Sequence, residues 1–149
     1  MRVALFQPDI PQNAGAILRL CACFRVGLDV IEPCGFVWSD AKLRRAGMDY
    51  IAKASLTRHM NWQAFRDAHP GRVVLATTKG AVSAYGFDYR PDDILLFGSE
   101  GAGVPDAVHD SAEARIRIPM VPDARSLNVA LSAGMILAEG LRATGQLPA

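Results

Sequence analysis

Apolar residues along the chain form two patterns that alternate from one end to the other. Short continuous apolar runs are typical of buried strands, and the sequence predicts strands over 3–7, 28–32, 72–77, 94–97 and 115–118. Apolar positions at helical spacing predict helices over 13–26, 42–46 and 61–69, and from near 126 to about 144. This alternation favours an α/β fold with a mainly parallel sheet and helices on both faces.

Local signals predict where these helices begin and end. Asn13 has the side chain of an N-cap for the first helix, and Gly27 is its predicted stop. Ser39 or Asp40 is predicted to cap the short basic helix over 42–46, and Ser126 is a candidate cap for the last one.

Length and charge limit the class of protein. A chain of 149 residues is expected to form one domain, 1–149. The net charge of +1 does not indicate nucleic acid by itself, so a polyanion would have to bind at a local patch. No stretch reaches the roughly 20 apolar residues of a membrane span, and the N-terminal apolar run looks too short for a signal peptide. We therefore expect no membrane association.

The cysteines and histidines give no metal-binding pattern. Cys21 and Cys23 are two residues apart in a helical segment, so they face different directions. His59, His69 and His109 show no paired spacing. We expect no metal, and buried free thiols in a reducing cytoplasm.

Polar and glycine-rich segments follow the predicted strands. They cover 7–13, 77–80, 98–103 and 119–128. Because ligands of parallel α/β sheets bind beyond the carboxyl ends of the strands, these loops are expected to build one composite site.

The segment Phe97-Gly-Ser-Glu-Gly-Ala-Gly-Val-Pro105 carries the clearest chemistry. It lacks the Lys-Ser or Lys-Thr of a phosphate-binding P-loop, and a dinucleotide fingerprint would follow the first strand instead. Glu100 would also repel phosphate, so a cationic or neutral polar ligand with an adenine-like edge is favoured. The alternative is a tight turn that leads into a helix at Pro105.

Three ordered motifs carry a resemblance that covers nearly the whole chain. They are Asn13-x-Gly15-x-x-x-Arg19, Gly98-x-Glu100-x-x-Gly-x-Pro105, and Ile118-Pro119-Met120 followed by Ser126-Leu127-Asn128. The chain resembles the SPOUT superfamily of methyltransferases, in particular its TrmH-type class. The stretches 31–36 and 43–50 look like the small subgroup that methylates the 2′-hydroxyl of cytidine or uridine 34 in tRNA.

The resemblance implies a function and a site. It implies S-adenosyl-L-methionine as methyl donor, a homodimer and a deep C-terminal trefoil knot, and as substrate the anticodon stem-loop of leucine tRNAs, methylated at the wobble nucleotide. The residues implied to line the cofactor pocket are Ala76, Gly98, Ile118 and Ser126, and those implied at the reacting end are Arg19, Asn13, Glu100 and Asn128.

The chemistry of these side chains constrains their roles. Relatives are usually described with the Arg19 equivalent as the group that deprotonates the ribose. A guanidinium has no acceptor, so we expect Arg19 to clamp a neighbouring phosphate and Glu100 to orient an amide; a base role for Glu100 stays open. No metal is required. The candidates for phosphate contacts with tRNA, each of which could also be an ordinary solvated residue, are Lys42, Arg44, Arg45, Arg58, Lys79 and Arg125.

Two features leave alternatives open. Asn128-Val129 is followed by Ala130-Leu131 where many relatives carry polar residues, so a non-catalytic S-adenosylmethionine- or RNA-binding module, or methylation at another tRNA or rRNA position, stays an alternative. A small hydrolase is disfavoured because no Gly-x-Ser-x-Gly segment is present.

The last helix is apolar on more than one side, which fits either a subunit interface or a helix buried within one chain.

Overall fold

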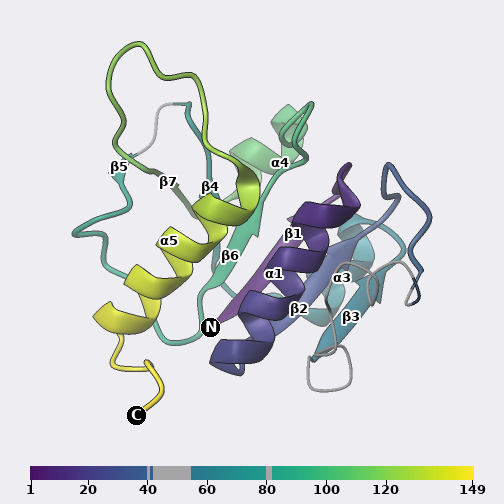
Figure 1. Cartoon of the computed structure of the whole chain (residues 1–149), viewed down its shortest axis with the longest axis horizontal. Coiled ribbons are helices and arrows are strands. Elements are labelled where there is room, and N and C mark those ends of the chain that lie inside the picture. The colour runs from purple at the N-terminus through teal and green to yellow at the C-terminus, as the bar shows by residue number, and fades with distance from the viewer. Residues whose placement is uncertain (40, 42–54, 80–81) are drawn as a thin grey trace.

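The computed structural model describes residues 1–39, 41, 55–79 and 82–149 (Figure 1). The strands in this part of the chain are β1 Arg2–Phe6, β2 Gly27–Ile31, β3 Leu56–His59, β4 Val73–Ala76, β5 Val82–Ser83, β6 Ile94–Phe97 and β7 Ala114–Arg117. They form one sheet in the order β3-β2-β1-β6-β4-β7-β5, and every strand pairing is parallel. The prediction of a parallel α/β sheet is confirmed.

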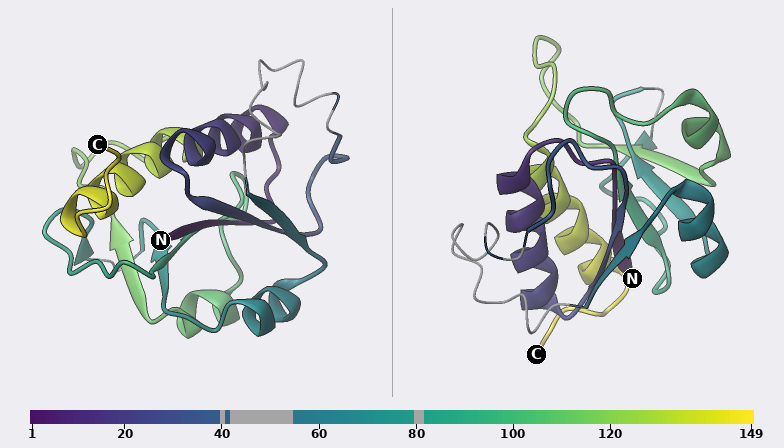
Figure 2. Two further views of the ribbon diagram at one scale, coloured as in Figure 1. Left: turned by 90° about the horizontal axis from the view of Figure 1, so that it is seen from below. Right: turned by 90° about the vertical axis from the view of Figure 1, so that its right-hand side faces the viewer.

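Helices cover both faces of this sheet. The long helices α1 Pro11–Phe24 and α5 Val129–Ala143 lie on one face, and the short helices α3 Trp62–Ala68 and α4 Asp106–Ser111 lie on the other (Figure 2). Two apolar clusters fill the space between the layers. The cluster under α1 and α5 includes Ile17 and Leu137, and the cluster under α3 and α4 includes Phe65 and Val108.

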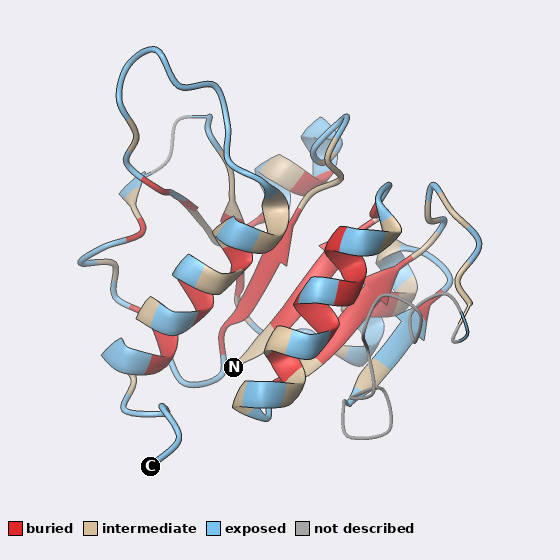
Figure 3. Cartoon of the chain, in the orientation of Figure 1, coloured by how far each residue is buried: buried red, intermediate tan, exposed pale blue. Residues whose placement is uncertain are grey.

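The central strands are buried on both sides (Figure 3). All four residues of β6 are buried, as are the last four of β1 and of β2. This burial explains why β6 and the last four residues of β1 are continuous apolar runs, whereas β2 carries the buried Asp29 within its run.

Three predicted helix boundaries are wrong. Helix α1 begins at Pro11 with Ile10 at the N-cap position, because proline suits the first helical residue and the Asn13 side chain bonds elsewhere. It ends at Arg25, which takes the left-handed conformation with φ 55°, and Gly27 already belongs to β2. Helix α5 is capped by Asn128 and not by Ser126, since the Asn128 side chain accepts from the first backbone amides.

Two edge strands, β3 and β5, were missed by the sequence patterns. Two of the four β3 residues are exposed and β5 has only two residues, so neither shows an apolar run. The predicted helix over 42–46 lies outside the described residues, and the trefoil knot stays a prediction. Within the described residues, no helix combines the length and the apolar character needed to cross a bilayer.

Candidate functional site

The glycine-rich loop after β6 folds back on itself. Ser99 and Gly103 form a reciprocal pair of backbone hydrogen bonds, with N···O distances of 3.0 and 2.9 Å. A Cβ atom on Gly98 would lie 2.6 Å from the carbonyl carbon of Gly103, and Gly103 itself has φ 65°. Glycine is therefore required at both positions by the shape of the loop. A helix does begin after Pro105, so the turn-to-helix interpretation is also correct for this segment.

The loop forms one wall of a cavity of about 560 Å³ at the carboxyl ends of the strands. Its floor is apolar, and its rim comes from four loops that are far apart in the sequence. The floor is formed by Leu75, Phe97, Ile116 and Ile136. The rim includes Ile10 and Asn13 after β1, Thr77 to Lys79 after β4, Gly98 to Glu100 after β6, and Ile118, Met120 and 126–129 after β7. Loops from four parts of the chain thus lie around one cavity, as expected for a composite site.

The structure brings together seven of the eight site residues expected from the resemblance. The four assigned to the cofactor pocket all line the cavity: Ala76, Gly98, Ile118 and Ser126. Asn13, Glu100 and Asn128 line it as well. Arg19 lies on α1 with its side chain exposed and is not among the lining residues, although Gly15, one turn earlier, is buried.

Three of these residues form a hydrogen-bonded row at the rim. Glu100 Oε1 accepts from Asn13 Nδ2 at 3.3 Å, and Asn13 Oδ1 accepts from Asn128 Nδ2 at 3.0 Å. Asn128 Oδ1 accepts from the backbone N–H groups of Ala130 and Leu131, at 2.8 and 3.2 Å. We call Glu100, Asn13 and Asn128 the rim network.

The groups at the two ends of the rim network fix the direction of its hydrogen bonds. An ionised carboxylate can only accept, so the NH2 group of Asn13 must face Glu100. Backbone N–H groups can only donate, so the oxygen of Asn128 must face the start of α5. The remaining contact, from the NH2 of Asn128 to the oxygen of Asn13, then follows. The amide orientations are therefore fixed without reference to any ligand.

Glu100 is occupied on both oxygens. Besides Asn13, it accepts from the backbone N–H of Asp9 at 2.7 Å, and the Asp9 carboxylate accepts in turn from Gly101 N at 3.1 Å. These contacts tie the loop after β1 to the loop after β6. The expectation that Glu100 orients an amide agrees with this arrangement.

The charges around the cavity are mixed. Lys79 and Arg117 line it together with Glu100 and His109. Among the other candidates for phosphate contacts, Arg125 is exposed in the loop before α5. Arg58 donates to the Glu32 carboxylate at 2.7 Å and lies over the Trp38 ring, so its placement has a structural explanation. Lys42, Arg44 and Arg45 lie outside the described residues.

Some cavity residues were missed by sequence reasoning. Ser132 lines the cavity one helical turn after Asn128, a spacing that could have identified it once Asn128 was recognised as the cap. His109 lies in α4 and was considered only as a metal ligand. No local pattern distinguishes it.

The cysteines are free, but only one is fully buried. Cys21 lies in the core, and burial raises the pKa of its thiol to about 12. Cys34 is half-buried, and burial together with the nearby Glu32 carboxylate raises its pKa to about 11. Cys23 is exposed, which corrects the expectation that the thiols are buried.

Comparison with known proteins gives consistent matches. The profile of the SpoU rRNA Methylase family matches residues 1–138. A protein of Beijerinckia indica subsp. indica, named tRNA (cytidine(34)-2′-O)-methyltransferase, is 55% identical over 148 residues, which cover 97% of this chain and 92% of that protein.

Solved structures agree with the family match. One, described as giving insights into the 2-OH methylation of C/U34 on tRNA, is 39% identical with a TM-score of 0.89 and covers 95% of this chain and 94% of its own. Another, an AdoMet-bound rRNA methyltransferase from Sinorhizobium meliloti, is 29% identical with a TM-score of 0.85; the match covers 95% of this chain and 55% of that one.

Proposed function

The chain belongs to the SpoU rRNA methylase family, and on that basis we propose that it is an S-adenosyl-L-methionine-dependent tRNA 2′-O-methyltransferase that acts on the wobble nucleotide 34 of leucine tRNAs. The observation that carries the proposal is the rim network, which joins one polar residue from each of the three motifs beside one cavity. Relatives named for methylation of cytidine 34 support the choice of nucleotide.

The cavity suits this cofactor in size and chemistry. Small-molecule sites usually have volumes of about 300–1,000 Å³ and apolar walls with a few polar groups. The floor of Leu75, Phe97 and Ile116 offers apolar contact to an adenine ring, and Gly98 allows the loop to fold closely against Gly103 beside it. When bound, S-adenosylmethionine supplies a methyl group activated by a positively charged sulfur. An AdoMet-bound structural neighbour supports the assignment.

The rim network is proposed to position the ribose. Glu100 keeps the Asn13 amide in one orientation, and Asn128 anchors that amide to the start of α5. Because both carboxylate oxygens of Glu100 already accept hydrogen bonds, orientation is a better role for it than proton removal. Alignment of reactants can supply up to about 7–11 kcal/mol of a barrier. Arg19, outside the cavity, is proposed to hold the RNA phosphate next to the reacting sugar.

We also propose that the enzyme is a homodimer in the cytoplasm. Leu131 and Met135 are exposed on α5 and Leu127 is exposed just before it, with 61% of Leu131 accessible. Such residues are typical of a subunit interface when they form a patch. The free cysteines fit a reducing compartment. Sedimentation should show a dimer that Leu131→Glu weakens and Val82→Glu, an exposed residue on β5, leaves intact.

Binding of the cofactor product is the first test. Calorimetry in the presence of a chelator should show about one S-adenosylhomocysteine per chain. Binding of ATP or NAD in its place would contradict the proposed cofactor. Binding without any methylation of tRNA would instead favour the non-catalytic module.

Methyl transfer is the second test. Leucine tRNA transcripts should gain a ribose methyl at nucleotide 34, and tRNA from a strain that lacks the gene should lose it. Loss of a ribose methyl at another position, with methylation of nucleotide 34 unchanged, would contradict the proposed substrate.

Glu100→Gln tests the role of the rim network in the same assay. The change places an NH2 donor against the Asp9 or Asn13 donor and should lower the rate of methyl transfer without abolishing it. Glu139→Gln, which removes an exposed pair with Arg142 on α5, is the matched control and should leave the rate unchanged.

A further inference from the structure

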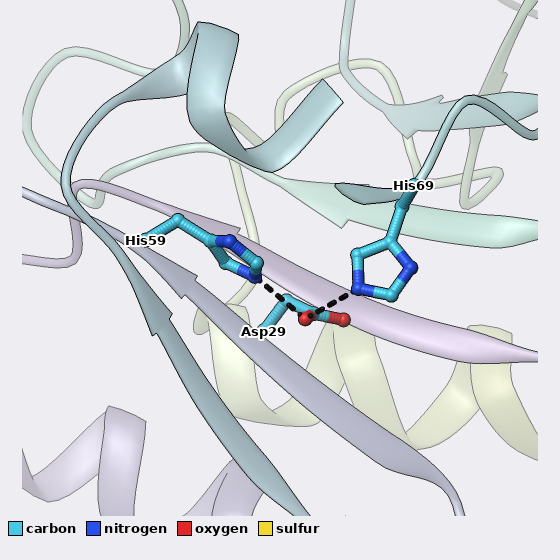
Figure 4. Close-up of side chains that lie close together, drawn as sticks. All are labelled: Asp29, His59 and His69. Carbon is cyan, nitrogen blue, oxygen red and sulfur yellow. Dashed lines mark hydrogen bonds and ion pairs between the residues drawn. The ribbon is translucent and has the colours of Figure 1, made fainter. Parts of the chain in front are cut away.

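The side chains of Asp29, His59 and His69 converge on one another (Figure 4), and none of them lines the cavity. Nε2 of His59 lies 2.8 Å from Asp29 Oδ1, and Nε2 of His69 lies 3.1 Å from the same oxygen. The three ligand atoms all lie within 4.8 Å of one another. The two histidines are ten residues apart in the sequence, so spacing alone did not reveal the pair.

Three elements build this cluster. Asp29 lies in β2 and His59 ends β3, the adjacent parallel strand, where it pairs with Ile31. His69 is the residue at the C-cap of α3, which packs on this face of the sheet through Phe65. The cluster therefore links two strands and a helix end.

Burial makes the cluster chemically unusual. The side chain of Asp29 is 0% exposed, that of His59 is 7% exposed and that of His69 is 24% exposed. A buried carboxylate is costly unless it is paired or coordinates a metal. Two imidazole nitrogens directed at one carboxylate oxygen satisfy it either by hydrogen bonds or by sharing a cation.

Arg2 fixes the orientation of the carboxylate. Its Nε donates to Asp29 Oδ2 at 2.8 Å, which leaves Oδ1 to the two rings. Carboxylate ligands of metals are commonly held by such a hydrogen bond on the second oxygen. The guanidinium thus positions Oδ1 without competing for it.

The two N···O separations are compatible with metal coordination, and the two imidazole nitrogens lie no more than 4.8 Å apart. With bonds of about 2.0–2.1 Å, neighbouring ligand atoms lie about 2.9 Å apart at octahedral angles and about 3.3 Å apart at tetrahedral angles. The observed N···O separations of 2.8 and 3.1 Å fall close to this range. Two imidazoles with one carboxylate favour zinc and its neighbours over magnesium or calcium, which prefer oxygen ligands.

We propose that Asp29, His59 and His69 bind one divalent first-row transition metal ion, Zn²⁺ in particular. The ion holds β2, β3 and the end of α3 together, and the partly exposed His69 side provides its path from solvent. The cofactor cavity is built from loops after β1, β4, β6 and β7. Loss of the ion is therefore expected to reduce stability and leave S-adenosylhomocysteine affinity unchanged, so this proposal and the proposed function can fail separately.

The test uses the full chain without an affinity tag, stripped with a chelator and dialysed. Calorimetry should show about one Zn²⁺ per chain, and Co²⁺ should give a visible ligand-field spectrum. At a Zn²⁺ concentration of about 100 times Kd, the Tm should rise by about 5–10 °C.

His69→Gln is the variant of choice because His69 is the most exposed ligand and glutamine can still donate to Asp29. It should lower Zn²⁺ affinity by more than about 100-fold, beyond the effect of losing a supporting hydrogen bond. His109→Gln changes a histidine of α4 that is not part of the cluster, and this variant should bind Zn²⁺ as the wild type does. No Zn²⁺ or Co²⁺ binding by the wild type, or binding that survives His69→Gln, would overturn the proposal in favour of a purely hydrogen-bonded cluster.

Discussion

Replacement of Asn128 by alanine removes two interactions at once. The side chain caps α5 through Oδ1 and holds the Asn13 amide through Nδ2. Loss of an N-cap costs about 0.5–2 kcal/mol. Loss of its donor also leaves the oxygen of Asn13, a residue only 9% exposed, without this partner, at a cost of about 1–3 kcal/mol. We expect the free energy of unfolding to fall by about 2 kcal/mol and the Tm by about 4–8 °C.

Asn61→Ala is the matched control. Asn61 caps α3 and accepts from Ala64 N at 2.8 Å, but it does not line the cavity. We expect a loss of about 1 kcal/mol, which corresponds to about 2–4 °C, with unchanged methyl transfer. The comparison separates the cost of a missing cap from that of a broken rim network.

Asn128→Ser separates the two roles within one residue. Serine caps helices about as well as asparagine but has no NH2 group to reach Asn13. The stability of the Asn128→Ser protein should lie between those of the wild type and Asn128→Ala. Its rate of methyl transfer should fall at least about tenfold, the equivalent of about 1.4 kcal/mol. Urea unfolding and single-turnover assays provide the two measurements. If Asn128→Ala is no less stable than Asn61→Ala and transfers methyl groups at the wild-type rate, the reasoning about the rim network is wrong.

Three further predictions address other parts of the site. Arg19→Ala should abolish methylation while S-adenosylhomocysteine affinity, measured by calorimetry, stays near that of the wild type, because Arg19 is outside the cavity. Gly98→Ala should weaken S-adenosylhomocysteine affinity, since its Cβ would lie 2.6 Å from the backbone of the loop. Gly134→Ala, in a helix with open space around the added Cβ, should instead raise the Tm slightly. In native protein a thiol reagent should label exposed Cys23 first and Cys21 only after unfolding, because burial raises the pKa of Cys21 to about 12. Mass spectrometry identifies the labelled residue, and early labelling of Cys21 would contradict its burial.

The sequence by itself determined the elements whose signals are local. Strand β6, Ile94–Phe97, is a continuous apolar run because both of its sides are buried, and it was predicted with its correct ends. Helix α3 was predicted over 61–69, and the structure shows Asn61 as its N-cap, where the side chain accepts from Ala64 N. Capping and burial patterns act over a few residues, so they can be read without knowledge of the fold.

Tertiary structure alone decided how distant polar residues are used. Asn13 has the side chain of a cap, yet it bonds to Glu100 and to Asn128, 115 residues away, because parallel strands bring their loops to one edge. Strand β3 escaped prediction because its position at the edge leaves it half exposed. The same strand pairing places His59 beside Asp29. Such contacts depend on strand order and register, which no short stretch of sequence encodes.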